Sequence, residues 1–367
     1  MEPMRIAMVS TPFVPVPPPR YGGTELIVAE LVGGFAAAGH EVTLFATGDS
    51  RPPPGVELRA RFERACWPPD GSVERVHAVW AAGQIAADRR GFDVVHAHVP
   101  SLLPFAGGLG APLVYTVHHD DSDEHAHLRP LYRRAIHAGA ALVAISARQK
   151  ALMAELARAR VIHHGLDGDR YALGAGDGDY CVYLGRIAAQ KGVHHALDAA
   201  HAARLPLRVA GAPHPGDEAY FEAQVAPRLT RAGAVAVGEV GAADKAALLG
   251  GARALLFPIE WEEPFGLVMI EAMLSGTPVL GFARGAAAEV IEDGVTGFLC
   301  RDAADMARRL RQIGARGFDR GGCRRRALAR WTTARMVRDH LAAYADVVRG
   351  IDDGRADEPI EPVEIGA

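Results

Sequence analysis

The stretch of residues 258–278, PIEWEEPFGLVMIEAMLSGTP, decides how the rest of the chain is interpreted. A short apolar run over residues 254–259 is typical of a buried strand, and a loop with three glutamates follows it. Residues 265–274 are then predicted to form a helix that ends at Gly276, before a second strand over residues 278–282. The sequence therefore predicts a strand–loop–helix–strand unit of an α/β protein.

Glu271 is unexpected in this predicted helix, which is apolar on nearly every side. It follows Leu267 by four residues and precedes Leu274 by three, so the three side chains share a face of the helix. A buried carboxylate costs free energy unless hydrogen bonds satisfy it. One interpretation is a structural glutamate with satisfied hydrogen bonds. The other is a ligand site, in which free backbone N–H groups of residues 265–268 hold an anion at the start of the helix.

The same stretch resembles a known family. Glu263-Pro-Phe-Gly-Leu-Val-Met-Ile-Glu271, followed by Ala-Met-x-x-Gly-x-Pro-Val, closely resembles the E-x7-E signature of the retaining glycosyltransferases of family 4. The resemblance covers nearly the whole chain and is strongest over residues 180–300. It implies an α/β fold of two Rossmann-like domains facing a cleft, the glycosyltransferase-B architecture.

Length and composition agree with two α/β domains. The chain has 367 residues, of which 49% are hydrophobic, and a net charge of −4, which argues against general nucleic-acid binding. Its four cysteines form no CxxC pair and are predicted to be reduced thiols rather than a disulfide or zinc site. No apolar run reaches the ~20 residues of a membrane span and no signal peptide is recognisable, so the protein is predicted to be cytoplasmic. Peripheral membrane contact is left open.

The order of the predicted elements gives the domain boundaries. Residues 1–167 form the first α/β domain, and a linker rich in Gly and Asp, residues 167–179, follows it. Residues 168–332 form the second α/β domain. In the resembled fold the last helix, here residues 333–349, crosses back to complete the first domain. Residues 351–367 carry six acidic side chains and are predicted to be a disordered tail.

Gly22 and Gly23 lie in the turn between the first predicted strand, residues 5–10, and the first helix, residues 24–38. Their spacing is not the G-x-G-x-x-G of dinucleotide-binding folds, and a flexible turn is the simpler interpretation. The resemblance implies instead that this glycine pair lets the backbone approach the diphosphate of a sugar-nucleotide donor across the cleft.

Arg186 and Lys191 follow the first predicted strand of the second domain, in the segment GRIAAQKG of residues 185–192. They are either solvated surface charges or part of a ligand site, since ligands of α/β proteins bind at such strand-to-helix loops. The resemblance implies that both cations bind the donor diphosphate. Two fixed cations and a helix N-terminus would stabilise the charge on a departing nucleoside diphosphate without a metal.

The two glutamates of the signature receive different roles from the resemblance. Glu263 is expected near the sugar hydroxyls and Glu271 near the ribose hydroxyls. The backbone between them completes the implied donor site, through Phe265, Gly266, Leu267 and Val268. A pair of hydrolytic carboxylates is the weaker alternative for Glu263 and Glu271.

The segment of residues 118–127, HHDDSDEHAH, holds four histidines and four acidic residues. Their spacing matches no standard zinc motif, so we predict an exposed polar loop with one functional histidine and no metal. The resemblance points to His118, which ends a predicted strand and is expected to face the donor sugar and the acceptor. His119 lacks that match.

The predicted function is therefore that of a metal-independent, retaining glycosyltransferase. It would move a hexose from a nucleoside-diphosphate sugar, with UDP favoured and GDP second, by front-face substitution. His118, Glu263, Arg186 and Lys191 form the expected catalytic set. The chain would use no cofactor besides the donor, and its acceptor, a small molecule, glycan or lipid, is left open. The alternatives are a sugar-nucleotide epimerase of the same fold and a non-catalytic nucleotide-sugar-binding protein.

Overall fold

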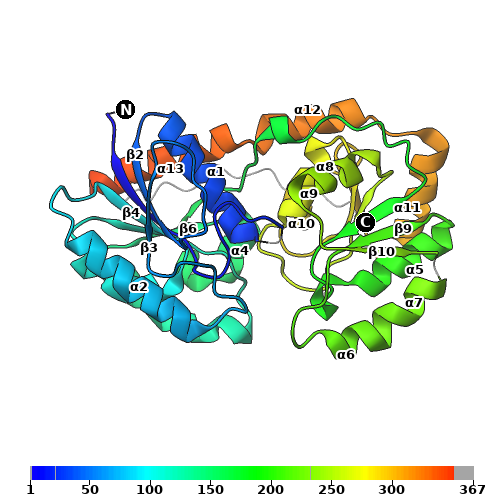
Figure 1. Cartoon of the computed structure of the whole chain (residues 1–367). Coiled ribbons are helices and arrows are strands. Elements are labelled where there is room, and N and C mark those ends of the chain that lie inside the picture. The colour runs from blue at the N-terminus through cyan, green and yellow to red at the C-terminus, as the bar shows by residue number, and fades with distance from the viewer. Residues whose placement is uncertain (1, 21, 232, 351–367) are drawn as a thin grey trace.

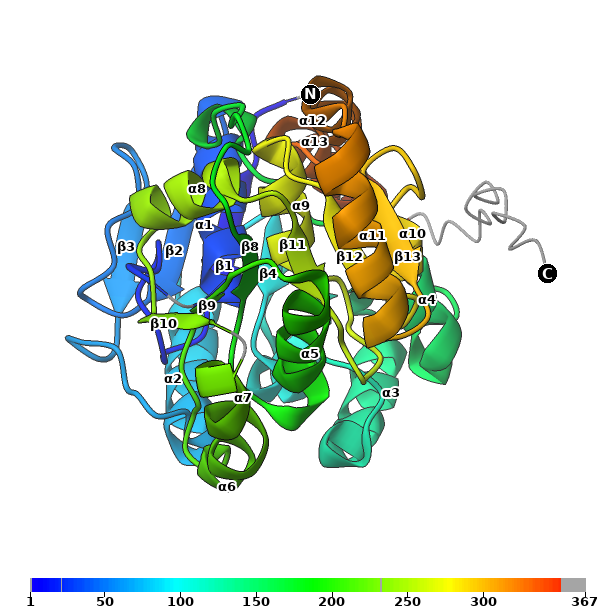
Figure 2. The same cartoon turned by 90° about the vertical axis from the view of Figure 1, so that its right-hand side faces the viewer.

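The computed structural model describes residues 2–20, 22–231 and 233–350, and it shows two α/β halves side by side (Figure 1). The predicted disordered tail, residues 351–367, lies outside the described residues. Seen along the long axis of the molecule, helices flank the strands of both halves (Figure 2). Within the described residues, no helix combines the length and the apolar character that crossing a bilayer requires.

The first half contains a parallel sheet of seven strands in the order β3-β2-β1-β4-β5-β6-β7. Ile6 of β1 pairs with Val42 of β2 on one side and with Val94 of β4 on the other. β3 was not predicted, because this short edge strand includes the charged residues Glu57 and Arg59 and stays half exposed. The strands are β1 (Arg5–Val9), β2 (Glu41–Ala46), β3 (Glu57–Ala60), β4 (Val94–Ala97), β5 (Leu113–Thr116), β6 (Ala141–Ala144) and β7 (Arg160–Val161).

The second half contains a parallel sheet of six strands in the order β10-β9-β8-β11-β12-β13. The strands predicted over residues 254–259 and 278–282 correspond to β11 and β12. β13 was not predicted, because Asp293-Gly294 and Thr296-Gly297 are typical of turns, and β13 begins at Gly297 itself. The strands are β8 (Cys181–Leu184), β9 (Leu207–Ala210), β10 (Val235–Gly238), β11 (Leu255–Phe257), β12 (Val279–Phe282) and β13 (Gly297–Cys300).

Helices connect the strands in both halves. The helix of the signature begins at Leu267 rather than at Phe265 as predicted, because Gly266 takes a positive φ of 85° just before it. Ser146 caps α4, because its hydroxyl accepts a hydrogen bond from the Gln149 N–H at 3.0 Å. The helices are α1 (Gly23–Ala37), α2 (Gly71–Ala86), α3 (Arg129–His137), α4 (Ala147–Leu152), α5 (Val193–Ala203), α6 (Glu218–Tyr220), α7 (Ala226–Arg231), α8 (Ala242–Gly251), α9 (Leu267–Leu274), α10 (Ala287–Val290), α11 (Ala303–Arg316), α12 (Arg320–Arg330) and α13 (Thr333–Val348).

The last helix, α13, packs on the first half of the chain, against α1 (Figure 1). The helices lie so close that a Cβ atom added to Gly34 would be 2.3 Å from a methyl carbon of Val337. Phe35 and Tyr344 bring their rings to 5.4 Å across the same contact. The chain thus leaves the first half at β7, builds the second sheet and returns.

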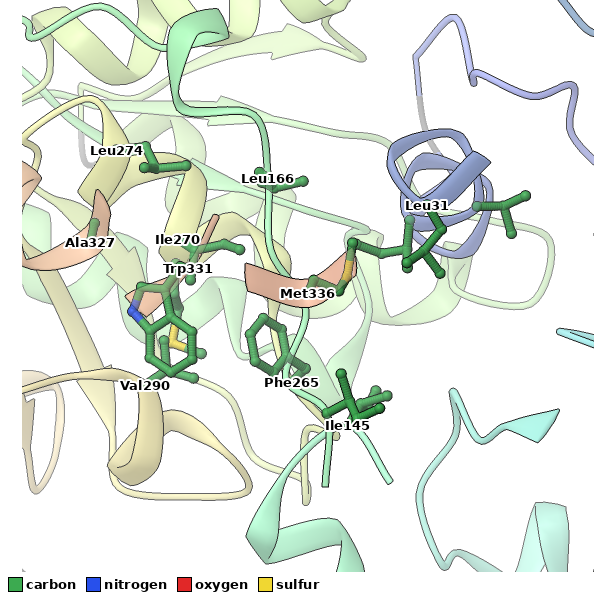
Figure 3. Close-up of a cluster of buried hydrophobic side chains, with 14 of the residues drawn as sticks. Leu31, Ile145, Leu166, Phe265, Ile270, Leu274, Val290, Ala327, Trp331 and Met336 are labelled. Atoms are coloured by element: carbon green, nitrogen blue, oxygen red, sulfur yellow. The ribbon is translucent and has the colours of Figure 1, made fainter. Parts of the chain in front are cut away.

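A hydrophobic cluster joins the two halves where the chain returns (Figure 3). Trp331, between α12 and α13, is 2% exposed and lies 5.8 Å from the ring of Phe265 at the entrance of α9. Leu166 and Met336 belong to the same cluster. The side chain of Phe265 is therefore part of the core, so this residue could contact a donor only through its backbone.

Candidate active site

A cavity of about 450 Å³ lies between the two halves. One wall is the glycine turn before α1, with Gly22 and Gly23. The opposite wall is formed where β8 and β9 end, at Leu184 and Ala210, and by the first turn of α9. This is the position at which open parallel sheets bind their ligands, outside the carboxyl ends of the strands.

Glu271 reaches this cavity from α9 although only 2% of the residue is exposed. The Tyr171 hydroxyl donates a hydrogen bond to its Oε1 at 2.9 Å, and Lys245 forms an ion pair with the same oxygen. Burial, and then the nearby Glu271 carboxylate, raise the pKa of Tyr171 far above its usual range, so the hydroxyl remains a donor. The second Glu271 oxygen is thus left for a ligand to use.

Tyr171 and Lys245 were not singled out from the sequence. Tyr171 lies in the predicted linker, but it is 6% exposed and lines the cavity. Lys245 lies on α8. The available signal was the need of the buried Glu271 for partners, which requires a donor but does not say which segment supplies it.

The glycine turn approaches the second half closely. Gly22 has a φ of 150°, and a Cβ atom there would lie 2.8 Å from the Pro18 Cβ. A Cβ atom added to Gly23 would lie 3.5 Å from the Leu267 Cδ1. Since the turn touches the start of α9, its backbone and the first turn of α9, including Val268, face the same space.

Arg186 also lines the cavity, and its Nε lies 3.4 Å from the Asp217 Oδ2. Two glycines allow the backbone segments beside Arg186 to pack closely together. Gly211 has a φ of 140°, and a Cβ atom there would lie 1.9 Å from the Gly185 oxygen. Arg186 therefore supplies a guanidinium to the cavity on a closely packed pair of loops.

Lys191 and Glu263 lie together, but outside the lining of this cavity. They form an ion pair, and the Trp261 Nε1 donates a hydrogen bond to the Glu263 Oε2 at 2.9 Å. The Lys191 ammonium also lies 4.6 Å from the centre of the Trp261 ring. Phe265, Gly266 and His118 are likewise absent from the cavity lining, so the predicted residues do not all line one cavity.

His118 lies in a histidine cluster of the first half. Its Nε2 is 2.7 Å from the His98 Nδ1, and its ring stacks on His164 at 5.5 Å. Burial lowers the pKa of His118 to about 3, so its imidazole is neutral at pH 7. A neutral imidazole can donate and accept hydrogen bonds, but it brings no positive charge.

The rest of the histidine-rich segment makes local contacts. His119 and His125 stack at 4.4 Å, and the His125 Nδ1 lies 2.9 Å from the Asp120 Oδ1. The segment is thereby folded onto itself beside α3.

Charged contacts join the loops of the two halves on another side of the interface. Arg148 of α4 makes two hydrogen bonds to Glu262, at 2.8 and 3.1 Å. Glu289 of α10 accepts hydrogen bonds from the backbone N–H groups of Ala147 and Arg148 and contacts His163. Glu289 is thus used in holding the halves together.

These features define a class: a two-domain parallel α/β protein with a nucleotide-sized cavity and a buried, partnered carboxylate between the domains. Residues 21–170 match the family described as Glycosyltransferase Family 4, and residues 170–317 match the family described as Glycosyl transferases group 1. The chain belongs to these group 1 glycosyltransferases, and the predicted family and glycosyltransferase-B fold are confirmed.

Similar proteins cover nearly the whole chain. Glycogen synthase of Mycobacterium tuberculosis is 30% identical, over 84% of this chain and 86% of its own length. The crystal structure of AviGT4, a glycosyltransferase involved in avilamycin A biosynthesis, superposes with a TM-score of 0.70 at 26% identity and covers 95% of this chain and 99% of its own. Anabaena Alr3699/HepE, solved with UDP and glucose, has a TM-score of 0.70 at 20% identity, covers 94% of this chain and 100% of its own, and is similar in fold.

Proposed function

We propose that this protein is a retaining glycosyltransferase that moves a hexose from a nucleoside-diphosphate sugar, with UDP favoured over GDP, to an acceptor held by the first half. The observation that carries the proposal is Glu271, a carboxylate almost fully buried and partnered, yet facing a cavity between the halves. Vicinal hydroxyls of a ribose are suitable donors to its remaining lone pairs.

The lining of the cavity suggests how the donor lies. A volume of about 450 Å³ is within the range of small-ligand pockets, about 300–1,000 Å³. With the ribose on Glu271, the diphosphate would run along the turn at Gly22 and Gly23 toward Arg186. The sugar would then extend toward the Lys191–Glu263 pair. The fold-level similarity to a protein solved with UDP and glucose agrees with a diphosphate donor of this kind.

The chemistry follows from what these groups can do. As the glycosidic bond to the diphosphate breaks, charge grows on the leaving oxygens, and Arg186 and Lys191 stabilise it. The acceptor attacks from the same face, and its proton passes to the leaving phosphate. Glu263 is engaged by Lys191 and Trp261, which suits a role in orienting sugar hydroxyls rather than in forming a covalent intermediate.

The first expected outcome is that UDP binds without a divalent ion. Arg186, the glycine turn and the start of α9 supply the positive potential that a metal would otherwise provide. Calorimetry of UDP binding in EDTA tests this expectation. If EDTA abolishes binding and Mg²⁺ or Mn²⁺ restores it, the metal-independent account is wrong.

A transfer assay separates the alternatives. Incubation with UDP-sugars and GDP-sugars, with and without candidate acceptors, should release nucleoside diphosphate in an acceptor-dependent way. An epimerase would instead convert the sugar of the donor, and a binding protein would leave the donor intact. Either result would overturn the proposed reaction.

Replacing Glu271 with Gln is expected to weaken UDP binding by about 1–3 kcal/mol, the scale for a hydrogen bond to a charged group. The amide cannot accept in the same way, and Lys245 loses its ion-pair partner. Isothermal calorimetry at constant pH measures the change. Glu222→Gln, an exposed carboxylate of the same half, is the matched control. Unchanged affinity in folded Glu271→Gln would remove Glu271 from the donor site.

Replacing His118 with Ala is expected to reduce transfer about tenfold while UDP affinity stays within about twofold, roughly 0.4 kcal/mol. The reason is its position in the first half, outside the cavity assigned to the nucleotide. Turnover and UDP affinity are measured on the same preparation. His127→Ala, an exposed neighbour, serves as control. Full turnover in His118→Ala would exclude it from the site.

A further inference from the structure

His194, His195 and Glu260 form a cluster that the proposed reaction does not use. Among the described residues, this is the one group of histidine and acidic side chains with metal-ligand spacing, its ligand atoms all within 4.8 Å of one another. His194 and His195 are the second and third residues of α5, and Glu260 lies in the loop after β11. The Glu260 N–H donates to the Gln190 oxygen at 2.8 Å, so the loop is fixed against the start of α5.

The nitrogens of both imidazoles converge on one carboxylate. The His195 Nε2 lies 3.2 Å from the Glu260 Oε1, and the His194 Nε2 lies 3.7 Å from the Oε2. The other nitrogen of His194, Nδ1, is 2.8 Å from the Tyr220 hydroxyl, which fixes the ring orientation. Histidines that ligate metals are usually held in this way, with the second ring nitrogen engaged by a polar partner.

We propose that His194, His195 and Glu260 bind a divalent transition-metal ion, with Zn²⁺ as the best match. Zn²⁺ accepts imidazole nitrogen and carboxylate oxygen at about 2.0–2.2 Å and commonly takes three protein ligands plus water. The ion would draw the three side chains together from their present separations, and the partly exposed Glu260 is free to follow. None of the three lines the cavity assigned to the donor, so the site is separate from it.

The surrounding charges leave the three ligands available. Lys191 is paired with Glu263, and Arg228 is paired with Asp198. Arg284 donates to the Glu260 backbone oxygen at 2.7 Å and not to its carboxylate. This guanidinium and the positive end of α5 oppose a cation, and the Glu260 carboxylate offsets them.

A proton is the competitor of a metal ion at these three side chains. The alternative is a trio in which one imidazole is protonated and ion-paired with Glu260. That arrangement would hold no metal. A direct measurement of Zn²⁺ binding therefore distinguishes the ion-paired trio from the metal site.

Such a site would link two loops of the enzyme. Gln190 precedes Lys191, and Glu260 lies three residues before Glu263. An ion bound between α5 and Glu260 would therefore hold the loop of Glu263 against the loop of Lys191. The binding itself does not depend on the proposed transfer reaction and is tested without a sugar substrate.

The experiment is calorimetric titration of the full chain with ZnCl2 after removal of metals by EDTA and dialysis. We expect one equivalent of Zn²⁺ to bind. Its affinity should fall at least tenfold in His195→Ala and in Glu260→Gln. Tyr220→Phe, which leaves the ligands in place, should weaken it about 10- to 100-fold, as loss of an outer-shell partner does. His201→Ala, an exposed histidine on the same helix, should leave it unchanged.

Two outcomes would overturn the proposal. One is the absence of stoichiometric Zn²⁺ binding by the unmodified chain. The other is an affinity that stays within about twofold in both His195→Ala and Glu260→Gln, which would place the ion on other histidines, such as those of residues 118–127. Co²⁺ absorption offers a second readout, because loss of a protein ligand changes its visible spectrum. If His195→Ala fails to fold, the exposed Glu260→Gln decides the question.

Discussion

Lowering the pH from 7.5 to 5.5 is expected to remove several kcal/mol from the free energy of unfolding. The cause is a set of five histidines that are buried in the folded protein as neutral imidazoles. Each of them is at most 3% exposed. Burial lowers the pKa of His77 and of His340 to about 4, and it lowers the pKa values of the others well below the usual range. The set is His77, His96, His98, His164 and His340.

The sign of the effect follows from which state binds the proton. Below about pH 6.5 the unfolded chain protonates its histidines, whereas the folded chain does not, so acid favours unfolding. Each buried histidine contributes about 1 kcal/mol by pH 5.5, set against a typical total stability of about 5–15 kcal/mol. Burial raises the pKa values of Glu25 and Glu30, and their proton uptake in the folded state offsets part of this loss.

Denaturant unfolding at pH 7.5, 6.5 and 5.5 measures this dependence. His340→Leu should reduce the slope, because it removes one group that takes a proton only on unfolding. His201→Ala, which changes an exposed histidine, should leave the slope unchanged. If the free energy of unfolding does not change between pH 7.5 and 5.5, these five histidines are not buried in the neutral form.

Much of the fold could be predicted, because the spacing of apolar residues and the positions of Gly and Pro indicate the same helix and strand boundaries in this chain. Short apolar strands followed by helices predicted two α/β domains, and the last helix, predicted over residues 333–349, is found as α13. The errors have local causes. Charged residues in β3 and turn residues in and before β13 conceal strands that exist because a neighbouring strand pairs with them. Gly266 shifts the start of α9 by two residues.

A residue of the candidate site was predictable only where its own sequence surroundings marked it as unusual. Glu271 was detectable because a carboxylate in an apolar helix requires an explanation. Its partners Tyr171 and Lys245 come from segments 100 and 26 residues away in sequence, and no local pattern fixes such contacts. Lys191 was expected beside the diphosphate with Arg186, and no local pattern indicated that it contacts Glu263 and Trp261 in the free protein.

Replacing Lys191 with Ala is expected to lower kcat by roughly 10²–10³, about 2.7–4 kcal/mol, with a smaller change in donor affinity. In the free protein the charge of Lys191 is balanced by Glu263, outside the cavity assigned to the nucleotide. Charge on the leaving phosphate is greater in the transition state than in the bound donor. Lys191 therefore contributes most after the glycosidic bond begins to break.

Arg186 should behave differently in one respect. Arg186→Lys should restore only part of the activity lost in Arg186→Ala, because a lysine offers a point charge in place of the two-pronged hydrogen bonding of a guanidinium to phosphate. Its position in the cavity lining also predicts a larger effect on donor affinity than Lys191→Ala produces.

The measurement is kcat and donor Kd for each variant with one working acceptor. The chain has three lysines, at positions 150, 191 and 245, and each has its own expected outcome. Lys191→Ala should reduce kcat, and Lys245→Ala should weaken donor binding because it removes the partner of Glu271. Lys150→Ala, which does not line the cavity, should change neither. If Lys191→Ala weakens Kd by the whole deficit and leaves kcat intact, Lys191 only binds the donor, and stabilisation of the leaving group must come from other residues.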